Sequence, residues 1–123
     1  MTEMSMDAEK LENSLISIAS ETFRFEKVFE KVMRCLSPEE QSKYMSQFSW
    51  FSKKVSRALN EAGLRVVSLE GSVYDPGMAI TPLNLDDFEI EDTLVVEQMI
   101  DPIIMQEDAV RKIGTAVLGR MEK

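Results

Sequence analysis

The chain has 123 residues, 44% of them hydrophobic, and a net charge of −8. Residues 64–123 carry five basic and twelve acidic residues, a net −7. This acidity disfavours binding to nucleic acid or a membrane surface, which requires clustered Lys and Arg. The single Cys35 excludes an intrachain disulfide, and no signal peptide or stretch of about 20 apolar residues is present, so we expect a cytoplasmic protein.

The first predicted element is a helix over residues 7–36, preceded by a tail of residues 1–6. Its apolar and near-apolar positions recur in alternating steps of four and three, as in the seam of a coiled coil or helix bundle. Two phenylalanines in this seam are bulky for a two-stranded contact and favour a wider bundle. The seam consists of Leu11, Leu15, Ile18, Thr22, Phe25, Phe29, Val32 and Leu36.

A second helix is predicted to begin at Ser37-Pro38-Glu39-Glu40. Ser37 suits the N-cap, Pro38 suits the first helical position, and Glu40 completes a capping box. The helix repeats the four-three pattern and ends at Gly63, a residue that adopts the left-handed conformation at helix ends, with Leu64 packing back. Its apolar positions are Tyr44, Phe48, Phe51, Val55, Ala58 and Ala62.

The tight turn between these helices predicts an antiparallel pair, which alone cannot enclose a core of this aromatic size. We therefore expect residues 1–63 to be a helical dimerisation region in which two copies of the chain form a four-helix bundle. The predicted dimer contacts are Leu15, Ile18, Phe25, Phe29, Val32, Leu36, Phe48, Phe51 and Val55.

From residue 64 onward the apolar residues form short runs broken by Pro, Gly and Asp. This pattern predicts a small all-β head over residues 64–123, and therefore an α+β chain. Strands are expected at residues 65–69, 78–85, 93–99, 103–105 and 110–118. Turns are expected at Asp75-Pro76-Gly77 and Asp101-Pro102, and a hairpin tip at Gln106-Glu107-Asp108.

The segments follow one another in a definite order. A helix pair and a Gly stop lead into a short strand and the turn Val73-Tyr74-Asp75-Pro76. An acidic connection, the strand Val95-Val96-Glu97-Gln98-Met99, two hairpins and a final strand with Ala116 and Val117 complete the series. This order resembles the GrpE family, the nucleotide exchange factors of DnaK-type chaperones, and can be matched over residues 64–118. The helix pair resembles the short helices of that family's dimeric four-helix bundle.

The resemblance implies a homodimeric co-chaperone whose head binds the ATPase domain of a DnaK-type chaperone and promotes ADP release. It implies a second contact from the helices, at Lys53, Lys54 and Arg57. The chain differs from the family in its shorter first helix and its lack of His. The partner contact is expected on the exposed face of the head, at Met99, Ile100, Asp101, Pro102, Ile103, Asp108, Arg111 and Leu118.

The sequence offers no set of catalytic groups, so we predict neither an enzyme nor a cofactor. Without His, serine–histidine and cysteine–histidine arrangements are excluded, and we expect Cys35 to be a partly buried, small apolar side chain. The acidic residues at 86–92 lack the Gly and Glu positions of a calcium hand, which favours a solvated loop or a contact with a basic partner over a metal. Trp50 lies off the seam and is expected to pack on the second helix pair or the head.

A second interpretation is a small, acidic, dimeric secretion chaperone, since low mass, a pI near 4.6 and nine methionines fit that class. Such proteins usually interleave their helices with a larger sheet, whereas here both predicted helices precede all the strands. A third interpretation is a non-catalytic adaptor or assembly subunit whose head only docks a partner.

Overall fold

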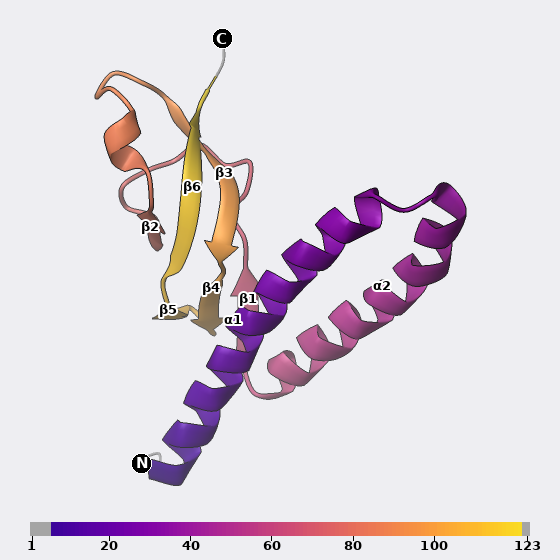
Figure 1. The fold of residues 1–123 in the computed structure, drawn as a ribbon. Helices are drawn as coiled ribbons and strands as arrows, with labels where there is room; N and C mark the ends of the chain where they lie inside the picture. Colours follow the sequence, from indigo (N-terminus) through magenta and orange to yellow (C-terminus); the bar gives the residue numbers. More distant parts are fainter. Residues whose placement is uncertain (1–5, 122–123) are drawn as a thin grey trace. The chain divides into compact units, whose positions relative to one another are not determined.

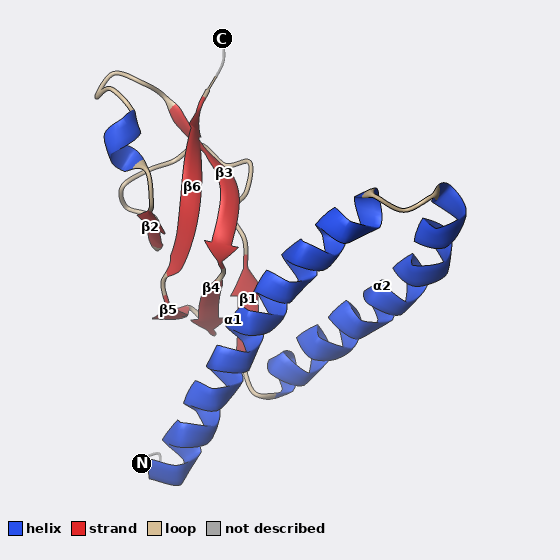
Figure 2. Cartoon of the chain, viewed as in Figure 1, coloured by secondary structure: helices blue, strands red, loops and turns tan. Residues whose placement is uncertain are grey.

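The computed structural model describes residues 6–121 and has an α+β fold, with two helices followed by two small three-stranded sheets (Figures 1 and 2). The chain divides into two compact units between Arg65 and Val66. The first unit is helical and the second carries most of the strands, as the change of apolar period near Gly63 predicts.

The two helices are α1 (Met6–Arg34) and α2 (Pro38–Glu61). Ser37 caps α2 as predicted: its hydroxyl oxygen accepts a hydrogen bond from the Glu40 backbone N–H at 3.3 Å, and Pro38 follows at the first position. Gly63 ends the helix with a φ of 77°, so the predicted left-handed stop is confirmed. The predicted tail lies outside the described residues, apart from Met6, which begins α1. No described helix is both long enough and apolar enough to cross a membrane.

Within the first unit, α1 and α2 contact each other through aromatic and polar side chains. The Phe29 ring stacks on Phe48 at a centroid distance of 5.1 Å, and Phe25 stacks on Phe29 at 6.2 Å. The Ser52 hydroxyl donates to the Glu26 carboxylate at 2.8 Å. These pairs join the C-terminal half of α1 to the middle of α2 and fix the register of the two helices.

The second unit is built from two short sheets. One has the strand order β1-β4-β5 and the other the order β2-β6-β3. The strands are β1 (Leu64–Val67), β2 (Ile80–Pro82), β3 (Leu94–Asp101), β4 (Ile103–Gln106), β5 (Ala109–Lys112) and β6 (Gly114–Arg120), with a 3₁₀ turn η1 (Leu85–Asp87) after β2.

Strand β6 lies between β2 and β3, parallel to β2 and antiparallel to β3. The other edge of β3 is covered by the segment before the Asp-Pro turn, where the N–H groups of Gly71 and Tyr74 donate to the carbonyls of Val96 and Leu94 at 2.8 Å. The Asn84 side chain extends the β2 side, since its amide donates to the Leu118 carbonyl and accepts from the Leu118 N–H, both at 2.9 Å.

The core of the head comes from alternate positions of these strands. Leu94, Val96 and Met99 of β3 are buried with Ala116 and Leu118 of β6, and Ile103 and Ile104 of β4 are buried as well. Most of these are branched or long aliphatic side chains, which fill the space between short strands.

Several predicted strand boundaries are wrong. Residues 110–118 form two strands rather than one, because the chain changes sheets at Ile113 and Gly114. A Cβ at Gly114 would lie 2.8 Å from the Asp101 carbonyl oxygen, so this crossing point requires glycine. The predicted strand at 78–85 shortens to β2. Among the described residues only β4 and β5 pair as consecutive strands, so the expected second hairpin is absent.

The predicted turns are better placed. Met78 N–H donates to the Asp75 carbonyl at 2.9 Å, which closes a four-residue turn with Pro76 at its second position. Gly77 does not use a positive φ there. The β4–β5 hairpin turns at Glu107, which has a φ of 54°, and Asp108, as the sequence predicts.

Candidate functional site

The head surface expected to meet a partner is the first candidate site, and half of its predicted residues are not on a surface. Met99 and Leu118 are 0% and 2% exposed, and Pro102 and Ile103 are also buried. The prediction that these four residues lie on the exposed face of the head is therefore wrong.

The physical reason is the alternation of the strands. Along β6, Gly114, Ala116 and Leu118 are buried at alternate positions, so Leu118 faces inward by period two; the adjacent Gly119 is buried as well. Strand β3 contains a bulge between Val96 and Gln98, and this extra residue turns Met99 to the same buried side as Val96. A bulge leaves no pattern in the sequence that marks its position.

Ile100 and Asp101 are half-buried at the end of β3. The Thr115 hydroxyl donates to the Asp101 carboxylate at 2.9 Å, and the Asp101 N–H donates to the Thr115 hydroxyl oxygen at 3.2 Å. Asp101 thus ties β3 to β6. Pro102 follows it between β3 and β4, so the predicted Met99–Ile103 turn is mostly strand.

The β4–β5 hairpin carries the other two predicted head residues. Asp108 is exposed at the tip. Arg111 is half-buried on β5, and its guanidinium donates to the Gln106 side-chain carbonyl oxygen on β4 at 2.6 Å. Because this bond holds the guanidinium across the hairpin, Arg111 and Asp108 form a small charged surface, the hairpin tip, that a partner can reach.

The predicted second contact lies on α2. Lys53, Lys54 and Arg57 are all exposed. Lys53 and Arg57 are four residues apart and share one helix face. Together with Lys54 they form a basic surface in a chain that is acidic overall.

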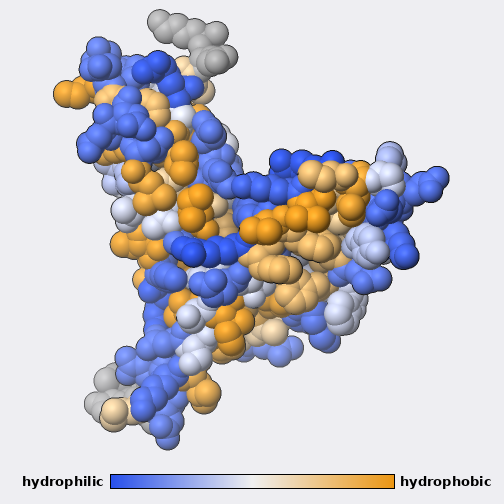
Figure 3. Space-filling model, in the orientation of Figure 1, coloured by the Kyte–Doolittle hydropathy of each residue, from blue (hydrophilic) through white to orange (hydrophobic). Residues whose placement is uncertain are grey.

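The helix pair provides the second candidate site, an apolar face formed by the predicted seam. Ile18 is 60% exposed and Phe25 61% exposed, and Leu15, Val32 and Phe51 are also exposed. Figure 3 shows apolar side chains gathered over the helical part of the chain. A groove of about 340 Å³ lies between the helices. It is lined by Phe51 of α2 and by five residues of α1, namely Ser17, Ile18, Glu21, Thr22 and Phe25.

The remaining predicted dimer residues are half-buried: Phe29, Leu36, Phe48 and Val55. Two of them, Phe29 and Phe48, stack on each other. We refer to the exposed and half-buried seam residues of both helices as the apolar helical face. An exposed apolar surface of this kind is uncommon on a monomeric protein, which makes this face a candidate interaction site.

Four other side chains on the helices complete the comparison with the sequence prediction. Cys35 is exposed, with its thiol 3.6 Å from the Lys31 carbonyl, so its predicted partial burial is wrong. Trp50 is 66% exposed within a single chain, and its packing on a second helix pair stays a prediction. Ile16 and Ala19 are buried although they lie off the predicted seam.

The acidic residues at 86–92 run from η1 towards β3. All of them are exposed except Asp92, which is half-buried. Within residues 6–121, no three carboxylate or thiol side chains come close enough together to hold a metal ion. Comparisons of the chain with protein-family models, with curated proteins and with solved structures gave no match.

Proposed function

We propose that this chain is a GrpE-like co-chaperone, a homodimer whose head binds the ATPase domain of a DnaK-type chaperone and promotes ADP release. The observation that carries the proposal is the apolar helical face, which remains exposed on a helix pair that precedes a strand-built head.

A second copy of the chain is the occupant that this face fits best. The stripe of α1 and the stripe of α2 adjoin at the groove formed by Ile18, Phe25 and Phe51. Two such helix pairs can bury their stripes against one another as a four-helix bundle. Self-association also suits a unit of about 60 residues, which buries too little surface to be very stable alone.

The head would then act by binding rather than by chemistry. A head that contacts the ATPase more strongly when its nucleotide cleft is open lowers the affinity for ADP. By linkage, ADP weakens the complex by the same factor. The hairpin tip, with Arg111 and Asp108, supplies charged groups for this contact, and Lys53, Lys54 and Arg57 supply a second set.

The test is release of a fluorescent ADP analogue from a DnaK-type protein with and without the full chain. We expect faster release, and loss of most of the acceleration in Arg111→Ala. Gln106→Ala is the matched control, because it removes the 2.6 Å bond within the hairpin but keeps the guanidinium charge. Loss in both variants would assign Arg111 to hairpin structure instead.

The same assay separates the other interpretations. Stable binding without faster release would make the chain an adaptor with a GrpE-like order of elements. Neither binding nor acceleration would contradict the proposal and favour the secretion-chaperone interpretation, which a pull-down with candidate secreted substrates would then test.

A further inference from the structure

A pocket of about 620 Å³ opens within the head beside the acidic connection. Its apolar lining is contributed by the turn after residue 73, by η1 and by the start of β3. Three carboxylates line it too, and the cation nearest to this lining is Arg120, which pairs with one of the three. The apolar residues are Tyr74, Pro76, Leu85, Phe88, Ile90 and Leu94, and the acidic ones are Asp86, Glu89 and Asp92.

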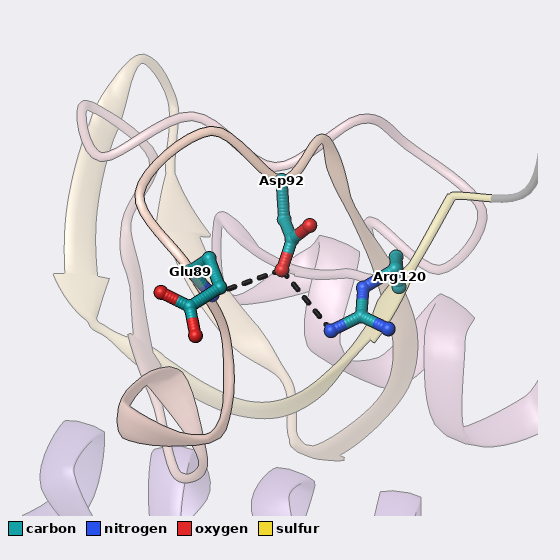
Figure 4. A network of polar contacts seen from close by, with 3 residues as sticks. All are labelled: Glu89, Asp92 and Arg120. Carbon is teal, nitrogen blue, oxygen red and sulfur yellow. Dashed lines mark hydrogen bonds and ion pairs between the residues drawn. The ribbon is translucent and has the colours of Figure 1, made fainter.

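One carboxylate of the pocket is already used to hold the loop. The Asp92 carboxylate accepts from the Glu89 backbone N–H at 2.9 Å and lies 3.2 Å from the Arg120 guanidinium (Figure 4). Asp86 and Glu89 instead have exposed side chains. The pocket therefore has a fixed wall and two carboxylates that face solvent and carry negative charge.

Arg120 shows which chemistry suits this part of the head. Its guanidinium pairs with Asp92 and lies over the Phe88 ring at 6.0 Å from the centroid. A cation is thus held next to an aromatic face and a carboxylate, the two groups that attract guanidinium most effectively. The pocket offers a second aromatic ring, Tyr74, together with Asp86 and Glu89.

The rim of the pocket indicates that its ligand also has an apolar part. Ile90 is fully exposed and Leu85 is 46% exposed, so two large aliphatic side chains stand in water beside the carboxylates. A polyamine or a divalent cation would leave them uncovered. A peptide segment that carries a cation next to an aliphatic side chain would satisfy both, since Arg and Lys also pack their methylene groups on apolar surface.

We propose that this pocket docks an amphipathic basic segment of a partner protein. An Arg or Lys side chain enters between Tyr74 and the Asp86 and Glu89 carboxylates, and a neighbouring aliphatic residue covers Ile90. The concentration of negative charge in the head attracts such a segment from a distance. The proposal is independent of the exchange activity proposed above.

The test is fluorescence anisotropy of a fluorescein-labelled peptide with two Arg-Leu pairs separated by Ser and Gly, titrated with the full chain. The double variant Asp86→Asn/Glu89→Gln is expected to weaken binding about fivefold, the size for two exposed ion pairs. The matched control Asp87→Asn/Glu91→Gln removes the same charge from the same loop outside the pocket, and is expected to weaken it by less than about twofold. A thermal melt of each variant checks the fold.

Two further peptides sharpen the result. Replacing Arg by citrulline, which has the same shape but no charge, or Leu by Ser should each abolish most of the binding. If both double variants weaken binding equally, net charge alone explains the binding, and the proposal that the peptide docks in this pocket is overturned. If the Ser peptide binds as tightly as the Leu peptide, or if spermine competes completely at a similar concentration, the ligand need not be an amphipathic segment and that part of the proposal is overturned. If no peptide binds, the whole proposal is overturned.

Discussion

The helix pair and the head use their apolar residues in opposite ways. In the head, Val96, Met99 and Ile104 are fully buried, and polar side chains such as Asn84 and Asp101 link the strands around them. In the helix pair, Ile18 and Phe25 are more than half exposed, and the seam is only partly covered by the contact between α1 and α2. The head therefore buries its apolar residues within one chain, whereas the helix pair leaves much of its apolar seam exposed.

This difference predicts that the two regions contribute to stability in different ways. A buried side chain stabilises the folded chain at any protein concentration, whereas an exposed apolar side chain contributes only when something covers it. If the cover is a second copy, the contribution of the helical face depends on concentration. The predictions below test this contrast, from the largest expected effect to the smallest.

Phe25→Asp should have the largest effect, and mainly on association, because within one copy it removes the stacking on Phe29 but little buried surface. Each copy would lose a buried aromatic contact worth about 1.5–3 kcal/mol, and a symmetric dimer loses it twice, so dimer dissociation should rise at least about a hundredfold. Sedimentation equilibrium measures this. Asn13→Asp is the control, since Asn13 is exposed on α1 outside the seam. If Phe25→Asp associates as strongly as wild type, the apolar helical face is not the dimer interface.

Ile104→Ala and Ile18→Ala should separate the two regions by stability. Ile104 is fully buried in the head, so its truncation should cost about 2–5 kcal/mol at every protein concentration. Ile18 is 60% exposed, so its truncation should cost less than about 0.5 kcal/mol in dilute protein and more in concentrated protein. Urea unfolding at two concentrations distinguishes them. A concentration-independent loss in Ile18→Ala would mean that the helix pair covers this residue itself.

Asn84→Ala should destabilise the head by about 1–3 kcal/mol, because it leaves both the N–H and the carbonyl of buried Leu118 without their side-chain partner. Asn84→Asp keeps an acceptor for the N–H but places a carboxylate oxygen beside the carbonyl. It should be at least as damaging at neutral pH and partly recover in acid, where a protonated carboxyl can donate. Thermal unfolding followed by circular dichroism reports both. Wild-type stability in Asn84→Asp would show that the amide is dispensable.

The helical half was predictable because its signals are local. Ser37, Pro38 and Gly63 mark the ends of α2 through their own backbone preferences, and the spacing of the seam placed Ile18 and Phe25 on one stripe. The same applies to the turns at Asp75-Pro76 and at the hairpin tip. In each case the residues that carry the signal are within a few positions of the structure they determine.

The head was less predictable because its structure depends on pairings distant in sequence. The bulge that buries Met99 and the parallel alignment of β2 with β6 follow from tertiary packing. The burial of Leu118 depends on the register of β6, so a resemblance in segment order could not place its side chain. One local signal was available: Gly114 lies inside the segment 110–118 that was predicted as one strand, and a Gly within a strand commonly marks a bulge or a close approach of two backbones.

Asp92→Asn should have the smallest effect, and pH reveals it. The backbone N–H of Glu89 lowers the pKa of the Asp92 carboxyl below its ordinary 3.8; burial raises this pKa in part, and the Arg120 guanidinium lowers it further. A carboxyl whose folded pKa is lowered stabilises the fold above its unfolded pKa, and the contribution disappears as pH falls through the folded pKa. Because Arg120 is 60% exposed, solvent screens the pair and the contribution is small.

Wild type should therefore melt at a higher temperature than Asp92→Asn at pH 7, and the two melting temperatures should converge in acid. Asp87→Asn, an exposed position in the same loop, should leave the melt unchanged. A gap between wild type and Asp92→Asn that persists at low pH would mean that the carboxylate charge does not hold this loop on the head.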